Sequence, residues 1–229
     1  MVIHNGGSVR RIKRSGAERR DEIARAVFGI VAEKGAGGIS VAAVAHRVGV
    51  APSALYRHYA GKDAMIDDAL ERLGARVAAN LERARASAGT PLGALEAFLG
   101  LHTEFIREYR GFPLMIFSDL VFQDPARRAR VAAMLAAARG AVAELVRAAQ
   151  RRGEARAELD PETAGFVFFG LFIPAGIHYH LTGGRFDITG HARRAWACYL
   201  AGLAARAPRS SRARRAPRAR RARRQEKPS

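Results

Sequence analysis

Apolar residues recur at helical spacing along most of the chain, and no stretch alternates convincingly between apolar and polar positions. Ile23, Val27, Ile30 and Val31 stand at i, i+4, i+7 and i+8, which predicts a helix over about 17–34. Because the same period continues through the rest of the sequence, the pattern predicts an all-α fold.

The later part of the chain repeats this helical period in longer segments. We expect helices over about 63–87, 91–109, 124–152, 161–181 and 188–205, with a short apolar helix ending at Phe122. The 161–181 segment is apolar on more than one face, which predicts burial on both sides. Pro174 should kink it, because proline lacks the N–H that a continuous helix needs.

Two further short helices are predicted between Ser40 and Lys62, giving about nine helices in total. Ser40 is a good N-cap for the first, and Gly49 suits the following turn because glycine accepts positive φ. Pro52 can occupy the first position of the second helix, which should continue until Gly61 breaks it. Two short helices joined by a turn form a helix-turn-helix, which places its second helix in the DNA major groove.

The residues at this turn and in the second helix follow a recognisable order. Gly49-Val50, Leu55-Tyr56, His58-Tyr59 and Lys62 resemble the DNA-binding signature of the tetracycline-repressor (TetR/AcrR) family, over about residues 18–70. Ala51 stands where that family usually has Ser or Thr, and Tyr59 where Phe is commoner. The resemblance implies a transcriptional regulator, usually a repressor, with an N-terminal DNA-binding head and a larger helical body.

The candidate DNA contacts fall into two groups, phosphate contacts that hold register and base contacts that give sequence preference. The first group is Ser40, Tyr56, His58 and Lys62, and the second is Pro52, Ser53, Ala54 and Arg57. The phosphate roles of Tyr56, His58 and Lys62 are implied by the resemblance. Arg57 is the candidate best suited to read a base, because its guanidinium can form two hydrogen bonds to one guanine. Two alternatives stay open: Tyr56 could pack under the head, and Arg57 could contact phosphate alone.

The body is larger than DNA binding requires, and the resemblance implies that it holds a small-molecule pocket between long helices. The candidates are large, mostly aromatic side chains: Phe98, His102, Phe105, Met115, Phe122, Phe166, Phe169, Ile173 and Trp196. For each of them, a place in the plain core is the favoured alternative. Their character favours an apolar or aromatic ligand of unknown identity. The last two helices are expected to form a four-helix homodimer interface, so that two heads bind a palindromic operator in double-stranded DNA.

The net charge of +18 is concentrated at the two ends of the chain. Residues 1–20 carry six basic and one acidic side chain, and residues 206–229 carry eleven basic and one acidic. We therefore expect a disordered basic arm at 1–16, the helix-turn-helix domain at 17–62, the ligand-binding and dimerisation domain at 63–206, and a disordered arginine-rich tail at 207–229. If the tail dominated DNA binding, the chain would instead be a sequence-tolerant DNA-coating or nucleoid-associated protein.

Other classes of function find little support in the sequence. It has no catalytic motif of a hydrolase, a metalloprotease or a phosphate-binding enzyme, so we expect neither enzymatic activity nor a cofactor. His178 and His180 point apart on a helix, so no metal site is expected. The lone Cys198 is expected to be a buried thiol in a reducing compartment. With no run of 18 apolar residues and no signal peptide, we expect a cytoplasmic protein without a membrane span.

Overall fold

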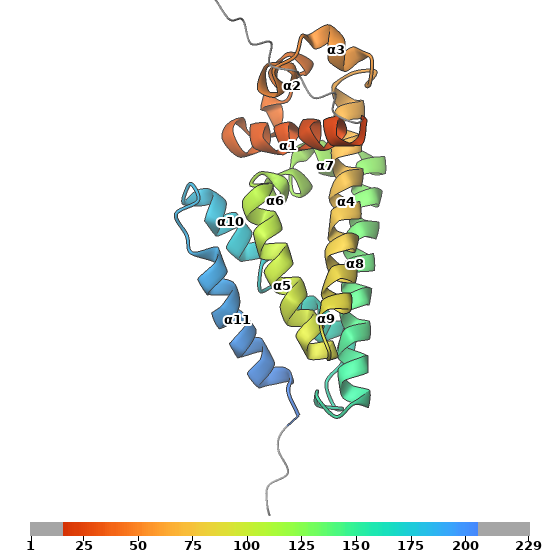
Figure 1. Ribbon diagram of the computed structural model, residues 1–229, viewed down its shortest axis with the longest axis vertical. Helices are drawn as coiled ribbons and strands as arrows, with labels where there is room; N and C mark the ends of the chain where they lie inside the picture. The colour runs from red at the N-terminus through yellow and green to blue at the C-terminus, as the bar shows by residue number, and fades with distance from the viewer. Residues whose placement is uncertain (1–15, 206–229) are drawn as a thin grey trace, which may run out of the picture.

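The computed structural model describes residues 16–205. The two expected basic arms lie outside this range, apart from Gly16, which begins the first helix. The head consists of α1 (Gly16–Lys34), a 3-10 turn η1 (Ala36–Gly38), α2 (Val41–Val48) and α3 (Pro52–Tyr56). Figure 1 shows α1 lying across the upper ends of the body helices, with α2 and α3 above it.

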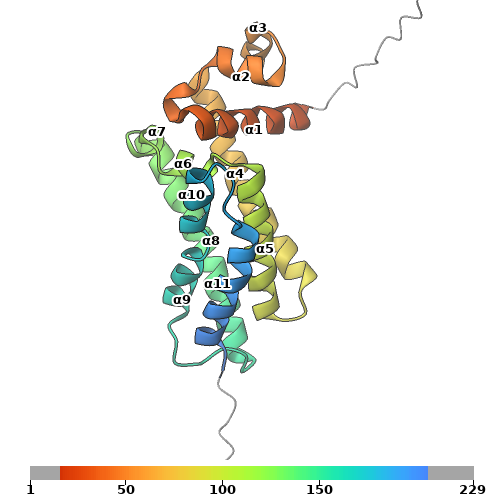
Figure 2. The same ribbon diagram turned by 90° about the vertical axis from the view of Figure 1, so that its left-hand side faces the viewer.

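The body is built from long helices that run away from the head. They are α4 (Lys62–Ser87), α5 (Pro91–Glu108), α6 (Phe112–Ile116), α7 (Asp119–Phe122), α8 (Pro125–Arg151), α9 (Pro161–Phe169), α10 (Ile173–Leu181) and α11 (Ile188–Leu203). In Figure 2, α10 and α11 lie on the side of the body that faces the viewer. Helix α9 packs along α8. The described residues form no β-strand, so the all-α prediction is confirmed. If the two broken pairs α6–α7 and α9–α10 are each counted once, the expected number of about nine helices also holds.

Helices α5 and α9 begin at side-chain caps, as the sequence indicates. Thr90 Oγ1 accepts a hydrogen bond from the Gly93 N–H at 3.0 Å. Asp160 Oδ2 accepts one from the Thr163 N–H at 2.7 Å. Each cap satisfies an amide that has no partner within its own helix, which fixes where the helix starts.

The expected kink at Pro174 is instead a complete break in the helix. The first segment ends at Phe169, and α10 begins at Ile173, which places Pro174 in its first turn. A proline at that position has no N–H to leave unsatisfied, whereas in a continuous helix it would clash with the carbonyl four residues earlier.

By length and composition alone, 161–181 is able to cross a membrane, although the sequence has no run of 18 apolar residues. In the structure the segment is interrupted, and α9 packs along α8 while α10 contacts α6 and α11. A core segment of a helical domain passes the same test of composition, but only 33% of this one is buried. Phe166, Val167 and Leu181 are exposed, so the predicted burial on both sides is wrong for this chain taken alone.

A buried arginine fixes the start of the connecting helix α4. The side chain of Arg127 on α8 is only 7% exposed and pairs with Asp63 at 2.7 Å and Asp67 at 2.9 Å. Asp124, the cap of α8, lies 3.8 Å from the same guanidinium. Because a buried guanidinium needs charged partners, this cluster holds the first turn of α4 against α8, directly below the head.

The head rests on the body through backbone rather than side chains at Gly111. A methyl group at this position would collide with the Phe28 carbonyl oxygen and stand 2.8 Å from the Ala32 nitrogen, both on α1. The turn between α5 and α6 therefore touches the backbone of α1 directly, and only glycine fits there.

Gly111→Ala should therefore destabilise the protein by about 1–3 kcal/mol, because α1 must move to admit the methyl group. Gly100→Ala is the matched control: it lies inside α5 with no atom within 4 Å of the added methyl group, and should stabilise by roughly 0.5–1 kcal/mol. Urea unfolding of both variants measures the difference. Equal changes in the unfolding free energy of the two variants would show that the close contact between α1 and Gly111 does not restrict residue size at position 111.

Candidate nucleic-acid interface

The turn of the helix-turn-helix has the geometry that its sequence indicates. Ser40 Oγ accepts a hydrogen bond from the Ala43 N–H at 3.0 Å and caps α2. Gly49 ends α2 with φ 68° and ψ 40°, in the left-handed region where a side chain would be strained. Pro52 occupies the first turn of α3, so the chain leaves the turn and immediately starts the recognition helix.

The recognition helix is shorter than expected. It ends at Tyr56 rather than continuing to Gly61. The N–H groups of His58 and Tyr59 both donate to the Leu55 carbonyl, at 2.9 and 3.0 Å, which closes the last turn early. Arg57 therefore lies at the C-terminal end of the helix, and His58 in the turn that follows.

The eight predicted DNA contacts lie at the N-cap of α2, in and just after α3, and at the start of α4. We call them the head face: Ser40, Pro52, Ser53, Ala54, Tyr56, Arg57, His58 and Lys62. Six of them are exposed, and Ala54 and Lys62 are half-buried. Tyr56 is 58% exposed, so it does not pack under the head as the alternative reading proposed; the neighbouring Leu55 is buried there instead.

Several polar groups on the head face have no partner within the part of the chain that the structure describes. The side chains of Tyr56, Arg57, His58 and Lys62 form no hydrogen bond or ion pair within residues 16–205. A donor or cation that is exposed and unpaired is able to bind phosphate or a base edge without first breaking an internal contact.

Tyr59, which belongs to the family signature, has a structural role. Its buried hydroxyl donates to Asp68 Oδ2 at 2.5 Å, and Arg72 Nε donates to the same oxygen at 3.0 Å. Arg72 also pairs with Asp21 on α1 at 2.5 Å. Burial, reinforced by the hydrogen bond to Asp68, raises the pKa of Tyr59. The chain Tyr59–Asp68–Arg72–Asp21, which sequence reasoning missed, joins the end of the recognition segment to α4 and α1.

A second pair fixes α2 on α1. Arg47 donates two hydrogen bonds to Glu33, each 2.7 Å long, in a bidentate arrangement. Planar pairing of this kind fixes direction as well as distance. The head therefore holds its recognition segment from two sides, through Arg47 and through Tyr59.

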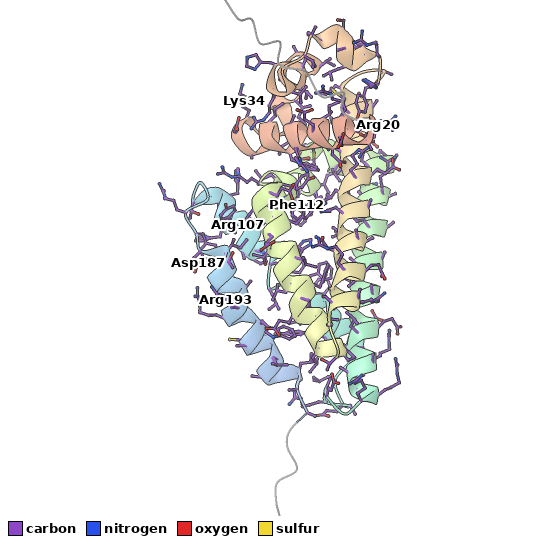
Figure 3. The ribbon with its side chains drawn as sticks, in the orientation of Figure 1. Arg20, Lys34, Arg107, Phe112, Asp187 and Arg193 are labelled. Carbon is purple, nitrogen blue, oxygen red and sulfur yellow. The ribbon has the colours of Figure 1, made fainter. Side chains whose placement is uncertain are left out.

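Several of the predicted pocket residues gather in one aromatic cluster inside the body. The ring of His102 lies 4.3 Å from Phe172 and 5.6 Å from Phe98, between centroids. Phe105 and Phe112 also contact His102, and Phe112, labelled in Figure 3, lies directly below α1. Sequence reasoning missed Phe112 and Phe172, although their spacing from other aromatic residues was visible.

His102 is a polar group in an apolar setting. It is fully buried, and burial lowers its pKa to about 4, so the ring is neutral at physiological pH. Its Nδ1 atom has no hydrogen-bond partner in the described part of the chain. A buried nitrogen without a partner is costly, and such groups occur where a water molecule or ligand completes the site.

The other predicted pocket residues divide into buried and exposed ones. Met115, Phe169 and Trp196 are buried, and Ile173 is half-buried. Phe122 and Phe166 are 52% and 66% exposed, so these two do not line an internal cavity. Each lies on the outer face of its helix. The sequence does not show which face of a helix its neighbours cover, so this exposure could not be predicted.

An apolar groove of about 360 Å³ lies between α9 and α11. We call it the α9–α11 groove, and it is lined by Leu159, Asp160, Thr163, Ala164, Val167, Cys198, Tyr199, Gly202 and Leu203. Tyr199 joins its two walls by donating to the Ala164 carbonyl at 2.9 Å. Cys198 is exposed in the groove, so the expectation of a buried thiol is wrong.

Comparison with known proteins assigns both parts of the chain. Residues 23–69 match the family model of the bacterial regulatory proteins of the tetR family, and residues 88–203 match a tetracyclin repressor-like C-terminal domain. Curated relatives from Actinobacillus pleuropneumoniae, named nucleoid occlusion factor SlmA, are 27% identical over 127 residues. That alignment covers 55% of this chain and 63% of theirs, which is less than two thirds of their length.

Two solved structures share the fold. The ketosteroid transcriptional regulator KstR2 of Mycobacterium tuberculosis is 19% identical, with a TM-score of 0.68 over 82% of this chain and 96% of that one. FadR of Bacillus subtilis, solved in complex with stearoyl-CoA, is 15% identical, with a TM-score of 0.67 over 80% of this chain and 98% of that one. Since the two family models match the head and the body in turn, the chain belongs to the tetR family of DNA-binding transcriptional regulators and is not an enzyme.

Proposed function

We propose that this regulator is a repressor that binds a palindromic operator through two copies of the head face and is released by a small apolar or aromatic ligand. The unpaired side chains of Tyr56 and Arg57, which are exposed, and of Lys62, which is half-buried, carry the DNA-binding part of the proposal. They project from a segment whose buried residues Leu55 and Tyr59 hold it in place. Such a surface meets phosphates at its edges and base edges at its centre.

The apolar surface of α9 and α11 supports dimerisation through this side of the body. Phe166 and Val167 are exposed large hydrophobic residues on α9, next to the α9–α11 groove. An apolar patch of this kind typically marks an interface. A twofold axis there would pair α9 and α11 with their symmetry mates and present both heads to one side of the duplex, roughly 34–36 Å apart.

The aromatic cluster around His102 supports an apolar ligand that carries one polar atom. Phenylalanine rings surround His102, and its Nδ1 atom has no hydrogen-bond partner in the described part of the chain. Of two proteins with the same fold, one is named for ketosteroid regulation and the other was solved with stearoyl-CoA. A ketosteroid is largely apolar, and stearoyl-CoA carries a long apolar acyl chain.

The basic ends and the relationship to SlmA favour a second candidate, a sequence-tolerant DNA-coating protein. The tail at 207–229 is rich in arginine and lies outside the described residues. Relatives with 27% identity are named nucleoid occlusion factors. In this alternative, phosphate contacts dominate, and binding is steeply salt-dependent on every sequence.

Footprinting on duplexes selected from a random pool distinguishes the two candidates. We expect a short protected palindrome. Tyr56→Ala and Lys62→Ala should weaken binding to all sequences, since each removes a phosphate contact. Lys62→Ala should also lower the salt slope by about 1, because it removes a cation. Arg57→Ala should also relax the preference at one base pair, at a cost of about 1–3 kcal/mol.

His46→Gln is a suitable control for these variants, because His46 is exposed on α2 but lies outside the head face. Uniform protection of every duplex would favour the DNA-coating candidate. Equal losses on selected and scrambled DNA for Arg57→Ala would assign Arg57 to phosphate alone.

Val167→Glu should convert the dimer to a monomer. Val167 is 51% exposed, so the monomer loses little packing, while a dimer would bury an unpaired carboxylate. Sedimentation equilibrium compares it with Ala86→Glu, an equally drastic change at an exposed position of α4. A Val167→Glu protein that stays dimeric would exclude this face as the interface.

The burial of His102 predicts how stability depends on pH. The unfolded chain binds a proton near pH 6.5, whereas the folded chain binds it only near pH 4. Falling pH therefore favours the unfolded state across this window, by up to about 3 kcal/mol from this one group. The unfolding free energy of His102→Leu should depend less on pH between 6.5 and 4 than that of the unaltered protein. Parallel curves would show that His102 is not held neutral.

A further inference from the structure

A second pocket lies where the head meets the body. We call it the joint pocket, and it is lined by Asp21, Phe28, Arg72, Leu73, Ala75, Arg76, Ala79, Phe105 and Tyr109. It belongs to α1, α4 and α5 together, and its volume is about 220 Å³. Since pockets for drug-sized molecules occupy roughly 300–1,000 Å³, this one suits a smaller molecule.

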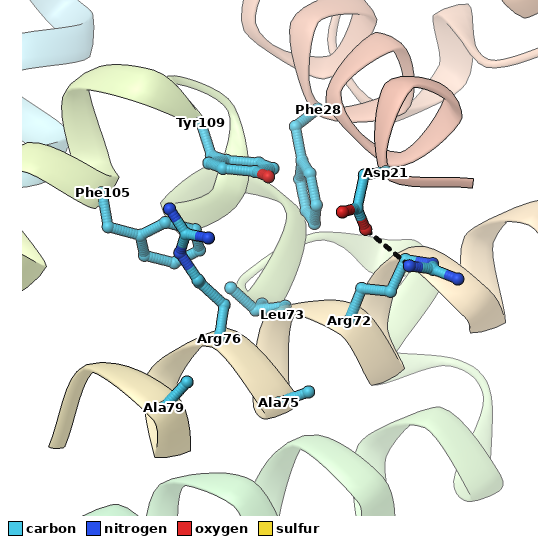
Figure 4. A pocket seen from close by; sticks show the side chains of 9 residues that line it. All are labelled: Asp21, Phe28, Arg72, Leu73, Ala75, Arg76, Ala79, Phe105 and Tyr109. Carbon is cyan, nitrogen blue, oxygen red and sulfur yellow. Dashed lines mark hydrogen bonds and ion pairs between the residues drawn. The ribbon is translucent and has the colours of Figure 1, made fainter. Parts of the chain in front are cut away.

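Arg76, Arg72 and Asp21 give the joint pocket a charged side, and Phe28, Phe105 and Tyr109 give it an aromatic side. Figure 4 shows the guanidinium of Arg76 beside the rings of Phe105 and Tyr109, with the Arg72–Asp21 pair at the other end. Arg72 is fully engaged, with Asp68 at 3.0 Å and Asp21 at 2.5 Å. Arg76 has a single long contact, 3.4 Å to Glu108, and is half-exposed. A guanidinium has five donors in a planar fork, so Arg76 retains the capacity to bind a carboxylate at two points.

We propose that the joint pocket binds a small amphipathic carboxylate, with its anionic group on Arg76 and its apolar part on Phe105, Tyr109 and Phe28. This site is separate from the aromatic cluster around His102, although Phe105 contributes to both. Two features indicate the class of ligand. Arg76, whose donors are mostly unpaired, favours an anionic group, and the aromatic rings favour an apolar group.

Contacts that hold the head lie in the joint pocket and next to it. On α1, Asp21 pairs with Arg72, and Arg25 reaches Glu108 at 3.1 Å and the Tyr109 hydroxyl at 3.3 Å. A carboxylate on Arg76 competes with Glu108, which is the acid that also holds Arg25. Binding therefore rearranges the ties between α1 and the body.

The network also extends to the recognition segment. Arg72 lines the pocket and holds Asp68, and Asp68 accepts the hydroxyl of Tyr59, three residues after α3 ends. A ligand that prefers one arrangement of this network shifts the population of head positions. By linkage, DNA and ligand then change each other's affinity by the same factor. This regulatory part rests on the proposed function, whereas the binding part does not.

Calorimetric titration of the full chain with octanoate, in the absence of DNA, tests the site. Octanamide has the same apolar chain without the charge and should bind at least tenfold more weakly. Arg76→Gln should weaken octanoate binding at least tenfold, because it removes the charged fork. Arg85→Gln is the matched control: it removes an arginine of α4 that pairs with Glu82 at 2.9 Å and lies outside the pocket, and its affinity should be unchanged.

A second pair of variants tests the position of the site without changing charge. Ala79→Met places bulk in the pocket lining, and Ala78→Met places it on the same helix outside the lining. Both alanines are exposed, so both variants should fold. Only Ala79→Met should lose octanoate binding. No binding of octanoate to the unaltered chain, or equal binding by Arg76→Gln and the unaltered chain, would overturn the site.

The regulatory role is measured separately on the selected operator duplex. Octanoate should weaken operator binding by the unaltered chain and by Ala78→Met, but not by Ala79→Met. Octanoate binding that leaves operator affinity unchanged would overturn the coupling while retaining the site. If the chain selects no operator at all, the proposed function fails. The titration without DNA still shows whether the joint pocket binds octanoate.

Discussion

The seating of α1 on the body rests on Arg72, which holds two carboxylates at once. Its Nη1 atom pairs with Asp21 on α1, and its Nε atom pairs with Asp68 one turn earlier on α4. Asp68 in turn accepts the buried hydroxyl of Tyr59. Charge-assisted hydrogen bonds between partly buried groups are stronger and more directional than exposed ion pairs. The orientation of the recognition segment therefore depends on a network that starts in the body.

Local chemistry was sufficient to predict the helix starts and the turn. Ser40, Thr90 and Asp160 cap helices because their side chains satisfy amides three residues away, and Gly49 adopts the conformation that its turn requires. These features depend on interactions over only a few residues, so a single sequence contains all the information. The eight residues of the head face could be proposed for the same reason, because they lie within one short stretch.

The features that the sequence did not reveal depend on contacts between distant elements. Phe122 and Phe166 are as apolar as Phe98, yet only Phe98 is buried, because burial depends on which helix covers which face. The exposure of Cys198 and the pairing of Arg127 with Asp63 and Asp67 are of the same kind. Helical periodicity identifies an apolar face but does not identify its neighbour.

Gly111 has a mechanical consequence for communication between the two parts of the molecule. The α5–α6 turn meets α1 backbone to backbone, with no side chain between them to change rotamer and absorb a displacement. Rotamer changes are the softest response that a packed interior has to strain. At this contact a movement of the C-terminal end of α5 displaces the backbone of α1 directly. Because α1 moves as one rigid helix, the displacement changes the tilt of the head.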